Sequence, residues 1–327
     1  MSEPADLSVV LVAPGGGASV RRTMRALRAQ TISERLQMVI VVPSVAELGP
    51  EMASAHGFAA LRAVEVGPIV NRGQAAAVGI QAATSPVVVL VEDHSYPEPG
   101  WASALLAAHA GPWIGVGPAV ENANPASAVS RVVFWLSYIA MTGRQKAGPR
   151  RLLPWHNSAY KRDALFGYGE SLGTLLAWEG NLQADLLSHG HQLYFEPAAR
   201  THHMNVSRLA SAVGLHFQRG RIFAGQRADR GRWPVWRRAL YALASPSFPA
   251  MQLRHIAPEL RRTGVAVHSL IAHAPVFALL LASMAAGEAV GFLAGVGDAI
   301  DRFEDYELRR QIHLRRGDRE SSELTGV

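Results

Sequence analysis

Short apolar runs alternate with longer segments of helical periodicity along the first 120 residues of the chain. The runs have strand length and end at proline, glycine or charged residues. They lie at residues 7–14, 36–44, 86–94 and 113–120. Helices are predicted between them, at residues 19–31, 52–64, 71–84 and 99–111. Strands that alternate with helices predict an α/β domain around a mixed, mainly parallel sheet flanked by helices, with ligands at the carboxyl ends of the strands.

The remaining pattern divides the chain into three parts. Residues 1–205 form the α/β domain, which ends with a helix and a strand at residues 175–203. Residues 206–315 are predicted to be helical, first basic and then apolar, and residues 316–327 are predicted to be a polar, disordered tail. The chain therefore combines an α/β domain with a C-terminal helical region.

The apolar C-terminal segment, residues 264–297, bears on membrane association. His268, His273 and Glu288 interrupt it, and its longest run without a titratable group has fourteen residues. A membrane-spanning helix needs about 20 apolar residues, and an ionisable residue within one is costly. A pair of helices lying in the membrane interface is therefore the prediction. A single spanning helix and a buried helical hairpin are the alternatives.

Positive charge is concentrated in one segment of the chain. Twelve arginines, no lysine and two acids lie between residues 200 and 262, whereas the whole chain has a formal net charge of +6. Arginine suits phosphate groups and anionic lipid headgroups. An anionic membrane surface is therefore an expected partner, with a solvated basic face as the alternative. No nucleic-acid-binding motif is present, so nucleic acid is not an expected partner.

The absence of cysteine and the N-terminal sequence limit the chemistry and the location. Without cysteine there are no disulfides, no thiolate metal ligands and no cysteine nucleophile. The N-terminus lacks a basic flank and has only a short apolar run, so it does not have the features of a signal peptide. The expected location is the cytoplasm, at the inner face of the cell membrane.

Three ionisable residues, Glu92, Asp93 and His94, follow directly after an apolar run. Carboxylate oxygens suit magnesium and manganese, and an imidazole shifts the preference toward manganese. Their position at the carboxyl end of a predicted strand favours a ligand site. The alternative is that they only end the strand and cap the following turn.

Three segments, in this order, resemble the sequence pattern of family 2 glycosyltransferases with the GT-A fold. They are LSVVLVAP with the following helix and strand, NRGQAAAVGIQAATSPVVVLVEDHSYPEPGW, and WEGNLQADLLSHGHQLYFEPAARTHH. The similarity covers about 200 of the 327 residues. It implies a GT-A-like, Rossmann-type fold, a nucleotide-sugar donor, and a divalent metal ion, Mn²⁺ or Mg²⁺, that neutralises the diphosphate leaving group.

The resemblance also implies roles for individual residues. Glu179 has the place of the family's catalytic acid and is expected to be the general base, with an exposed first-turn carboxylate as the alternative. The implied metal ligands are Asp93, His94 and His203, where His203 is preferred to His202 and a buried structural histidine is the alternative.

Contacts to the two substrates follow from the same resemblance. Donor contacts are implied at Pro14, Gly15, Asn71, Arg72, Glu92 and Asp93. The segment FQRGR resembles, with different spacing, a Gln-Arg motif that binds diphosphate, and it adds Arg219 and Arg221. Acceptor contacts are implied at Trp155, His156 and Asn157, with a helix-entry loop as the alternative. Pro43-Ser44 and the glycines after Pro14 depart from the family pattern in the nucleotide pocket, so the base is not assigned.

The predicted function is metal-dependent, inverting transfer of a sugar from a nucleotide sugar to a glycan or lipid-linked acceptor of the cell envelope. Two alternatives come from other classes of protein. One is a catalytically inactive GT-A-like binding or scaffold protein, which the altered nucleotide pocket favours. The other is a nucleotidyltransferase, which shares the sheet and the metal chemistry. A homo-oligomer is compatible with the sequence.

Overall fold

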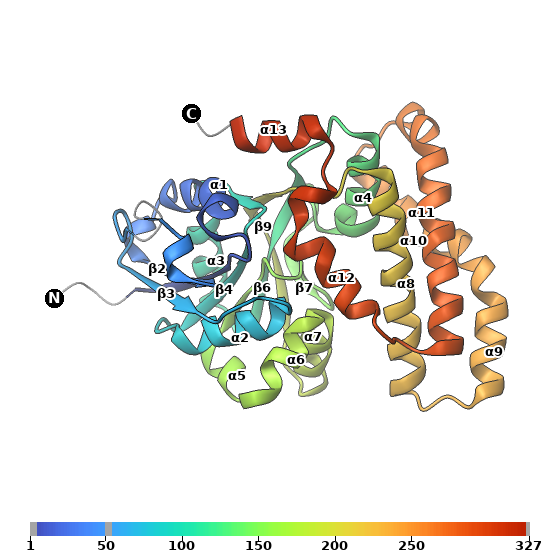
Figure 1. The fold of residues 1–327 in the computed structure, drawn as a ribbon, viewed down its shortest axis with the longest axis horizontal. Coiled ribbons are helices and arrows are strands. Elements are labelled where there is room, and N and C mark those ends of the chain that lie inside the picture. Colours follow the sequence, from blue (N-terminus) through green and yellow to red (C-terminus); the bar gives the residue numbers. More distant parts are fainter. Residues whose placement is uncertain (1–4, 50–53, 325–327) are drawn as a thin grey trace. The chain divides into compact units, whose positions relative to one another are not determined.

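The computed structural model describes residues 5–49 and 54–324 of the chain. These residues form two compact units. Unit 1 comprises the described residues up to Ala123, those of Met141–Met204 and those from Glu320 onward. Unit 2 comprises Asn124–Ala140 and Asn205–Arg319. Figure 1 shows the elements of both units along the chain.

Unit 1 is built around a sheet that has nine strands within the described residues. The strands are β1 (Leu7–Val12), β2 (Leu36–Val42), β3 (Ala60–Glu65), β4 (Val87–Glu92), β5 (Ser95–Pro97), β6 (Gly115–Asn122), β7 (Gly148–Arg150), β8 (Ala159–Lys161) and β9 (Leu193–His203). The helices are α1 (Gly16–Arg28), α2 (Arg72–Ala82), α3 (Trp101–His109), α5 (Arg162–Phe166), α6 (Leu172–Ala177) and α7 (Glu179–Ser188). The strand order is β3-β2-β1-β4-β8-β6-β9-β5, and β7 pairs with β9.

The longest strand pairings in this sheet are parallel. They join β1 to β2 and β4, β2 to β3, and β6 to β9. The antiparallel pairings involve β5, β7 and β8 and extend over two or three residue pairs each. The predicted mixed, mainly parallel sheet flanked by helices is therefore confirmed. Val12 lies opposite Glu92, so β1 and β4 end at the same edge of the sheet.

Alternate residues of the central strands are buried on opposite faces of the sheet. On β1, Leu7, Val9 and Leu11 pack with residues of α1 and α3. Val10 and Val12 pack on the other face with residues of α2, α6 and α7. Burial on both faces favours apolar side chains along the whole strand, which explains the long apolar runs in the sequence. The buried polar residues Ser8 and Gln37 are hydrogen-bonded to each other.

The helix predicted at residues 52–64 is wrong where the structure describes it. Residues 52 and 53 lie outside the described residues, and Ala60–Glu65 form strand β3 beside β2. Leu61 packs with the cluster on one face of the sheet and Val64 with the cluster on the other. Hydrogen bonds to β2 stabilise this strand, and a single segment's composition does not reveal such a partner.

Unit 2 is helical. Its helices are α4 (Ala128–Tyr138), α8 (Leu209–Arg230), α9 (Val235–Ala244), α10 (Phe248–Arg262), α11 (Val267–Ala294) and α12 (Ala299–Leu308). The backbones of α8 and α11 approach closely, because a Cβ atom at Gly287 would lie 2.0 Å from the Phe217 carbonyl oxygen. A Cβ atom at Gly220 would lie 2.1 Å from the Met284 carbonyl oxygen. Glycine is therefore required at the centre of this helix pair.

Most of the apolar segment at residues 264–297 forms one long helix, Val267–Ala294, and the predicted helix pair is wrong. Helix α11 continues through Pro275, because the segment holds no cluster of turn-forming residues that would reverse the chain. Among the described residues, α11 alone is long and apolar enough to cross a membrane, and 44% of its most apolar window is buried. A core helix has the same properties, and α11 is consistent with a membrane-associating region.

The C-terminal tail was predicted to be disordered, but Arg316–Leu324 form helix α13. Residues 325–327 lie outside the described residues. Asp318 lies in the first turn of α13, where a negative charge stabilises the helix through its dipole. The polar composition of this segment is therefore compatible with a helix.

Candidate active site

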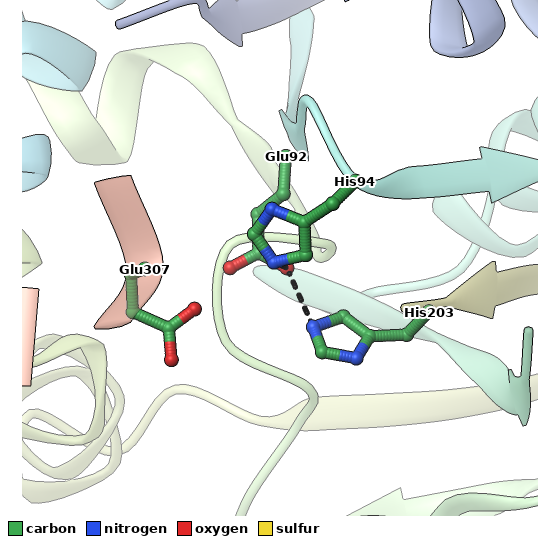
Figure 2. A group of neighbouring side chains, drawn as sticks. All are labelled: Glu92, His94, His203 and Glu307. Atoms are coloured by element: carbon green, nitrogen blue, oxygen red, sulfur yellow. Dashed lines mark ion pairs between the residues drawn. The ribbon is translucent and has the colours of Figure 1, made fainter. Parts of the chain in front are cut away.

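The carboxyl end of β4 brings a carboxylate and two imidazoles together. Glu92 is the last residue of β4, and β5 pairs with β9 so that Ser95 lies opposite His203. Glu92 Oε2 lies 3.3 Å from His203 Nε2 and 3.7 Å from His94 Nε2. The centroids of the two rings are 4.9 Å apart, and all three side chains are buried (Figure 2). Three potential metal ligands therefore face one another.

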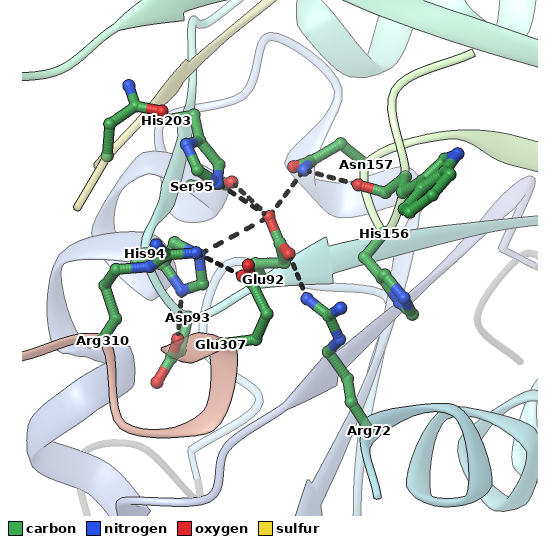
Figure 3. A network of polar contacts seen from close by, with 12 residues as sticks. Arg72, Glu92, Asp93, His94, Ser95, His156, Asn157, His203, Glu307 and Arg310 are labelled. Carbon is green, nitrogen blue, oxygen red and sulfur yellow. Dashed lines mark hydrogen bonds and ion pairs between the residues drawn. The ribbon is translucent and has the colours of Figure 1, made fainter. Parts of the chain in front are cut away.

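The Glu92 carboxylate is also held by two further side chains. The Arg72 guanidinium donates to Oε1 at 2.6 Å, and Asn157 Nδ2 donates to Oε2 at 2.9 Å (Figure 3). Burial alone would raise the pKa of Glu92, but His94, His203 and Arg72 outweigh it and hold this pKa well below its usual range. Glu92 is therefore a buried carboxylate that stays ionised.

Asp93 lies on the opposite side of the His94 ring from Glu92. His94 Nδ1 donates to Asp93 Oδ1 at 2.8 Å, while Nε2 of the same ring faces Glu92. A carboxylate on one ring nitrogen fixes the tautomer and leaves the other nitrogen able to bind a metal ion. In this arrangement Asp93 orients His94, and Glu92 takes the position facing both imidazoles.

Glu179 begins α7, directly after a break between α6 and α7 at Trp178. Its side chain is completely buried. Oε1 accepts a hydrogen bond from the Tyr160 hydroxyl, and Oε2 accepts one from the His156 backbone N–H. Burial raises the pKa of Glu179 to about 7, against these two hydrogen bonds, which lower it. A carboxyl group with this pKa can accept or release a proton near neutral pH.

Residues 155–157 connect the two carboxylates. The backbone N–H of His156 donates to Glu179, and the side chain of the next residue, Asn157, donates to Glu92. His156 has φ 52°, in the left-handed region that is uncommon for a non-glycine residue. Strained backbone of this kind is frequent at functional sites. Glu92 and Glu179 therefore belong to one polar site within unit 1.

The three predicted acceptor residues all lie at this site. His156 and Asn157 are buried and contact the carboxylates, whereas Trp155 is half-buried. The Trp155 ring packs edge-on against Trp178, with 4.4 Å between centroids. The aromatic pair therefore stands beside Glu179, the first residue after Trp178.

The predicted donor residues of unit 1 lie at the same sheet edge or at the start of a helix. Pro14 is half-buried and Gly15 is exposed, two and three residues after the end of β1. The Asn71 side chain caps α2, since its Oδ1 accepts from the Gln74 backbone N–H at 2.9 Å. The next residue, Arg72, is the ion-pair partner of the β4 carboxylate. The first residue of α2 therefore supplies the guanidinium group that pairs with Glu92.

The other two predicted donor residues belong to α8 in unit 2. Arg219 donates to the Ser137 hydroxyl at 2.8 Å. Burial lowers the pKa of the Arg219 guanidinium below its usual range. Arg221 pairs with Asp298 at 3.0 Å and also donates to the Gly295 carbonyl. Both arginines therefore make contacts that hold unit 2 together, and their role toward a diphosphate stays a prediction.

Two side chains that contact Glu179 were not predicted from the sequence. Tyr160 on β8 donates to Glu179, and Gln183 Nε2 donates to Glu179 Oε1 at 3.4 Å and to the Tyr160 hydroxyl at 2.9 Å. Gln183 lies four residues after Glu179, which places both on one face of α7, and this spacing was the available signal.

Between the adjacent histidines, His202 pairs with Glu98 at 2.9 Å and is partly exposed, so His203 is the one that faces the site.

No family model and no curated protein sequence matches the chain. Among solved structures, the mannosyltransferase PcManGT from Pyrobaculum calidifontis in complex with GDP-Man and Mn²⁺ has a TM-score of 0.53 and 15% identity. The match covers 88% of this chain and 87% of that one. It shows the same fold and confirms the predicted GT-A-like architecture.

Two further solved structures are more distant. GalNAc-T7 with UDP, GalNAc and Mn²⁺ has a TM-score of 0.46 and 16% identity, and the match covers 62% of this chain and 44% of that one. S. aureus TarS 1-349 in complex with UDP has a TM-score of 0.39 and 13% identity, with 58% and 59% covered. The chain thus spans less than half of the GalNAc-T7 chain and about three fifths of the TarS chain.

Proposed function

We propose that the chain is a metal-dependent, inverting glycosyltransferase that transfers a sugar from a nucleotide sugar to a glycan or lipid-linked acceptor. The observation that carries this proposal is the loop at residues 155–157, which joins the β4 carboxylate and Glu179 within one site. The fold shared with PcManGT, a mannosyltransferase solved with GDP-Man and Mn²⁺, supports it. We assign this activity to a domain at residues 1–205.

The donor set at the end of β4 fits a divalent cation. Glu92, His94 and His203 each offer a ligand atom, and these atoms lie within 4.8 Å of one another. Two imidazoles and one carboxylate suit Mn²⁺ better than Mg²⁺. When bound, such a cation would neutralise the negative charge of a diphosphate leaving group. In this proposal Glu92 replaces Asp93 as the third ligand, and Asp93 orients His94.

Glu179 is the proposed general base. Its pKa of about 7 leaves a substantial fraction of the side chain ionised near neutral pH. The acceptor hydroxyl gives its proton to Glu179 while its oxygen forms a bond to the anomeric carbon of the donor. The bond from that carbon to the phosphate oxygen breaks, and its electron pair leaves with the nucleoside diphosphate. A single displacement of this kind inverts the anomeric configuration.

Residues near Glu179 orient the base and the acceptor. Tyr160 and the His156 backbone each donate to one carboxylate oxygen, so they fix the plane of the carboxylate. The Trp155 side chain offers an aromatic face on which a sugar ring can pack. Asn157 donates a hydrogen bond to Glu92 and so holds this loop beside the proposed cation site.

We further propose that unit 2 contacts an anionic membrane surface at the cytoplasmic face. Helix α9 exposes Val235, Trp236 and Leu243 with relative exposures of 82%, 68% and 80%. Arg237 and Arg238 lie on the same helix. Exposed apolar and aromatic side chains beside arginines are typical of helices that lie in a membrane interface. A lipid-linked acceptor would be presented at such a surface.

A second candidate function, a GT-A-like binding or scaffold protein without turnover, is favoured by one observation. Arg72 and Asn157 already occupy both oxygens of Glu92, and Glu179 has no exposed surface. A buried, internally satisfied network can hold a fold together without catalysis. The two candidates differ in whether the site binds a metal ion with a nucleoside diphosphate.

Calorimetric titration of the full-length protein with UDP, GDP, ADP and dTDP, with and without MnCl₂, tests the proposal. We expect one nucleotide to bind only with Mn²⁺, and His94→Ala and His203→Ala to weaken this binding at least tenfold. His189→Ala is the matched control, because this exposed histidine lies in the same unit. Binding of no nucleotide at any Mn²⁺ concentration would reject sugar transfer and leave the scaffold function.

A further inference from the structure

A cavity of about 440 Å³ lies within unit 2, between helices α8, α10 and α11. It is lined by Phe223, Ala224, Arg227, Arg230, Phe248, Gln252, Met284, Glu288 and Phe292. Binding sites for small molecules have volumes of about 300–1,000 Å³ and are lined mainly by apolar side chains with a few polar groups. The volume and the lining of this cavity match that description.

The apolar part of the cavity is well ordered by packing. Met284 and Phe292 are eight residues apart on α11, so they face the same side of that helix, and both are buried. Phe292 stacks on Trp233, with ring centroids 5.7 Å apart and planes at 11°. Phe223 on α8 also lines the cavity and is 37% exposed. The cavity therefore has buried apolar side chains and one partly exposed aromatic side chain in its lining.

Two arginines give the cavity a positive edge. The Arg227 guanidinium lies 5.2 Å from the ring centroids of both Trp233 and Tyr241, which hold it in place. Arg230 is exposed and donates to the Gln226 carbonyl of its own helix at 3.3 Å. Glu288 is the single acidic residue in the lining, so the described lining has a formal charge of +1. A guanidinium can donate two parallel hydrogen bonds to a phosphate group.

We propose that this cavity binds the alkyl chain of a single-chain lipid phosphate, with the phosphate group on Arg227 and Arg230. Apart from the two arginines, only Gln252 and Glu288 in the described lining offer polar partners for the hydroxyl groups of a sugar or the edges of a base, so a nucleotide sugar fits this cavity less well than an amphiphile does. Free phosphate would bury no apolar surface there. An amphiphile with an alkyl chain and a phosphate group can contact the apolar lining and the two arginines at the same time. The site lies in unit 2 and does not depend on the activity proposed for unit 1.

Calorimetric titration of the full-length protein with octyl, decyl and dodecyl phosphate, each below its micelle concentration, tests this proposal. Each buried methylene is expected to tighten binding up to about fourfold until the cavity is filled. Inorganic phosphate should bind at least a hundredfold more weakly than dodecyl phosphate. Affinities that do not change with chain length, or equal binding of inorganic phosphate, would overturn the proposal.

Substitutions distinguish lipid phosphate binding in the cavity from a general effect of surface charge. Arg230→Glu is expected to weaken dodecyl phosphate binding at least tenfold, whereas Arg254→Glu, an equal charge change at an exposed position on α10, should leave it within twofold. Met284→Trp fills the cavity and should abolish binding; its circular dichroism melting curve checks that it folds. Equal effects of the two arginine variants, or binding only to anionic phosphatidylglycerol vesicles, would show a surface interaction instead.

The Glu179→Gln variant distinguishes failure of this proposal from failure of the proposed function. It should bind dodecyl phosphate as the wild-type protein does, because its substitution lies in unit 1. Loss of lipid phosphate binding in that variant would contradict an independent site in unit 2.

Discussion

Replacement of Glu179 by glutamine tests the electrostatics of the site with little change of shape. Burial raises the pKa of Glu179 from 4.5 to about 7, so the folded protein binds more protons than the unfolded chain between these pH values. The wild-type protein therefore loses stability as the pH rises through about 7, whereas glutamine does not titrate. A rise from 4.5 to about 7 corresponds to about 3 kcal/mol, at about 1.4 kcal/mol per tenfold change in proton affinity.

The assay is urea denaturation of both proteins at about pH 5 and about pH 8.5. The difference in free energy of unfolding should shift by about 2–3 kcal/mol in favour of Glu179→Gln between these pH values. The amide oxygen can accept from the His156 N–H while the amide nitrogen donates to the Tyr160 hydroxyl, so the hydrogen bonds have replacements. Glu170→Gln, at an exposed position in the same unit, is the control and should shift by less than about 0.5 kcal/mol. A difference that does not depend on pH would refute the reasoning.

Three other predictions concern side chains around the site and in unit 2. Tyr160→Phe removes a hydrogen bond that lowers the pKa of Glu179. The acidic limb of the pH–rate profile should therefore move to higher pH, and activity near pH 6 should fall by on the order of tenfold. An unchanged profile would show that Tyr160 does not influence the pKa of Glu179. Arg72→Met leaves a buried carboxylate without its cation and should cost about 3–5 kcal/mol in urea denaturation, and a cost under about 1 kcal/mol would contradict a tight buried pair. Gly287→Ala places a methyl group against a backbone carbonyl of α8 and should lower the stability of unit 2 by about 1–3 kcal/mol, whereas Gly317→Ala, which meets nothing within 4 Å, should not destabilise.

The sheet was predictable from the sequence because its central strands are buried on both faces. Continuous apolar runs marked β1, β2, β4 and β6, and turn residues ended each of them. Strand β3 was not predictable, since it lies at the edge of the sheet and its stability depends on pairing with β2. The single helix α11 was not predicted because His268, His273 and Glu288 shorten the uninterrupted apolar run in the sequence. Titratable residues interrupt an apolar run, but they do not end a helix.

The candidate site was predictable in its position and only partly in its contacts. The end of β4 was identified from local sequence and Glu179 from the resemblance to family 2 glycosyltransferases, and the structure brings Glu92 and Glu179 to one site. The proposed exchange of roles between Glu92 and Asp93 rests on which way each side chain points after the strand ends, and local sequence does not determine this direction. Tyr160 was not predicted because its strand has only three residues and its partner is 19 residues away in the sequence. Contacts of this kind come from tertiary packing, which local patterns do not encode.

Release of nucleoside diphosphate from a panel of nucleotide sugars, with Mn²⁺ and with glycan and lipid-linked acceptors, tests the central claim most directly. The proposed base predicts at least one donor that the wild-type protein turns over and that Glu179→Gln binds but turns over about 10²–10⁴-fold more slowly. Equal turnover by the two proteins, or no turnover of a donor that the wild-type protein binds, would contradict a glycosyltransferase site at Glu179.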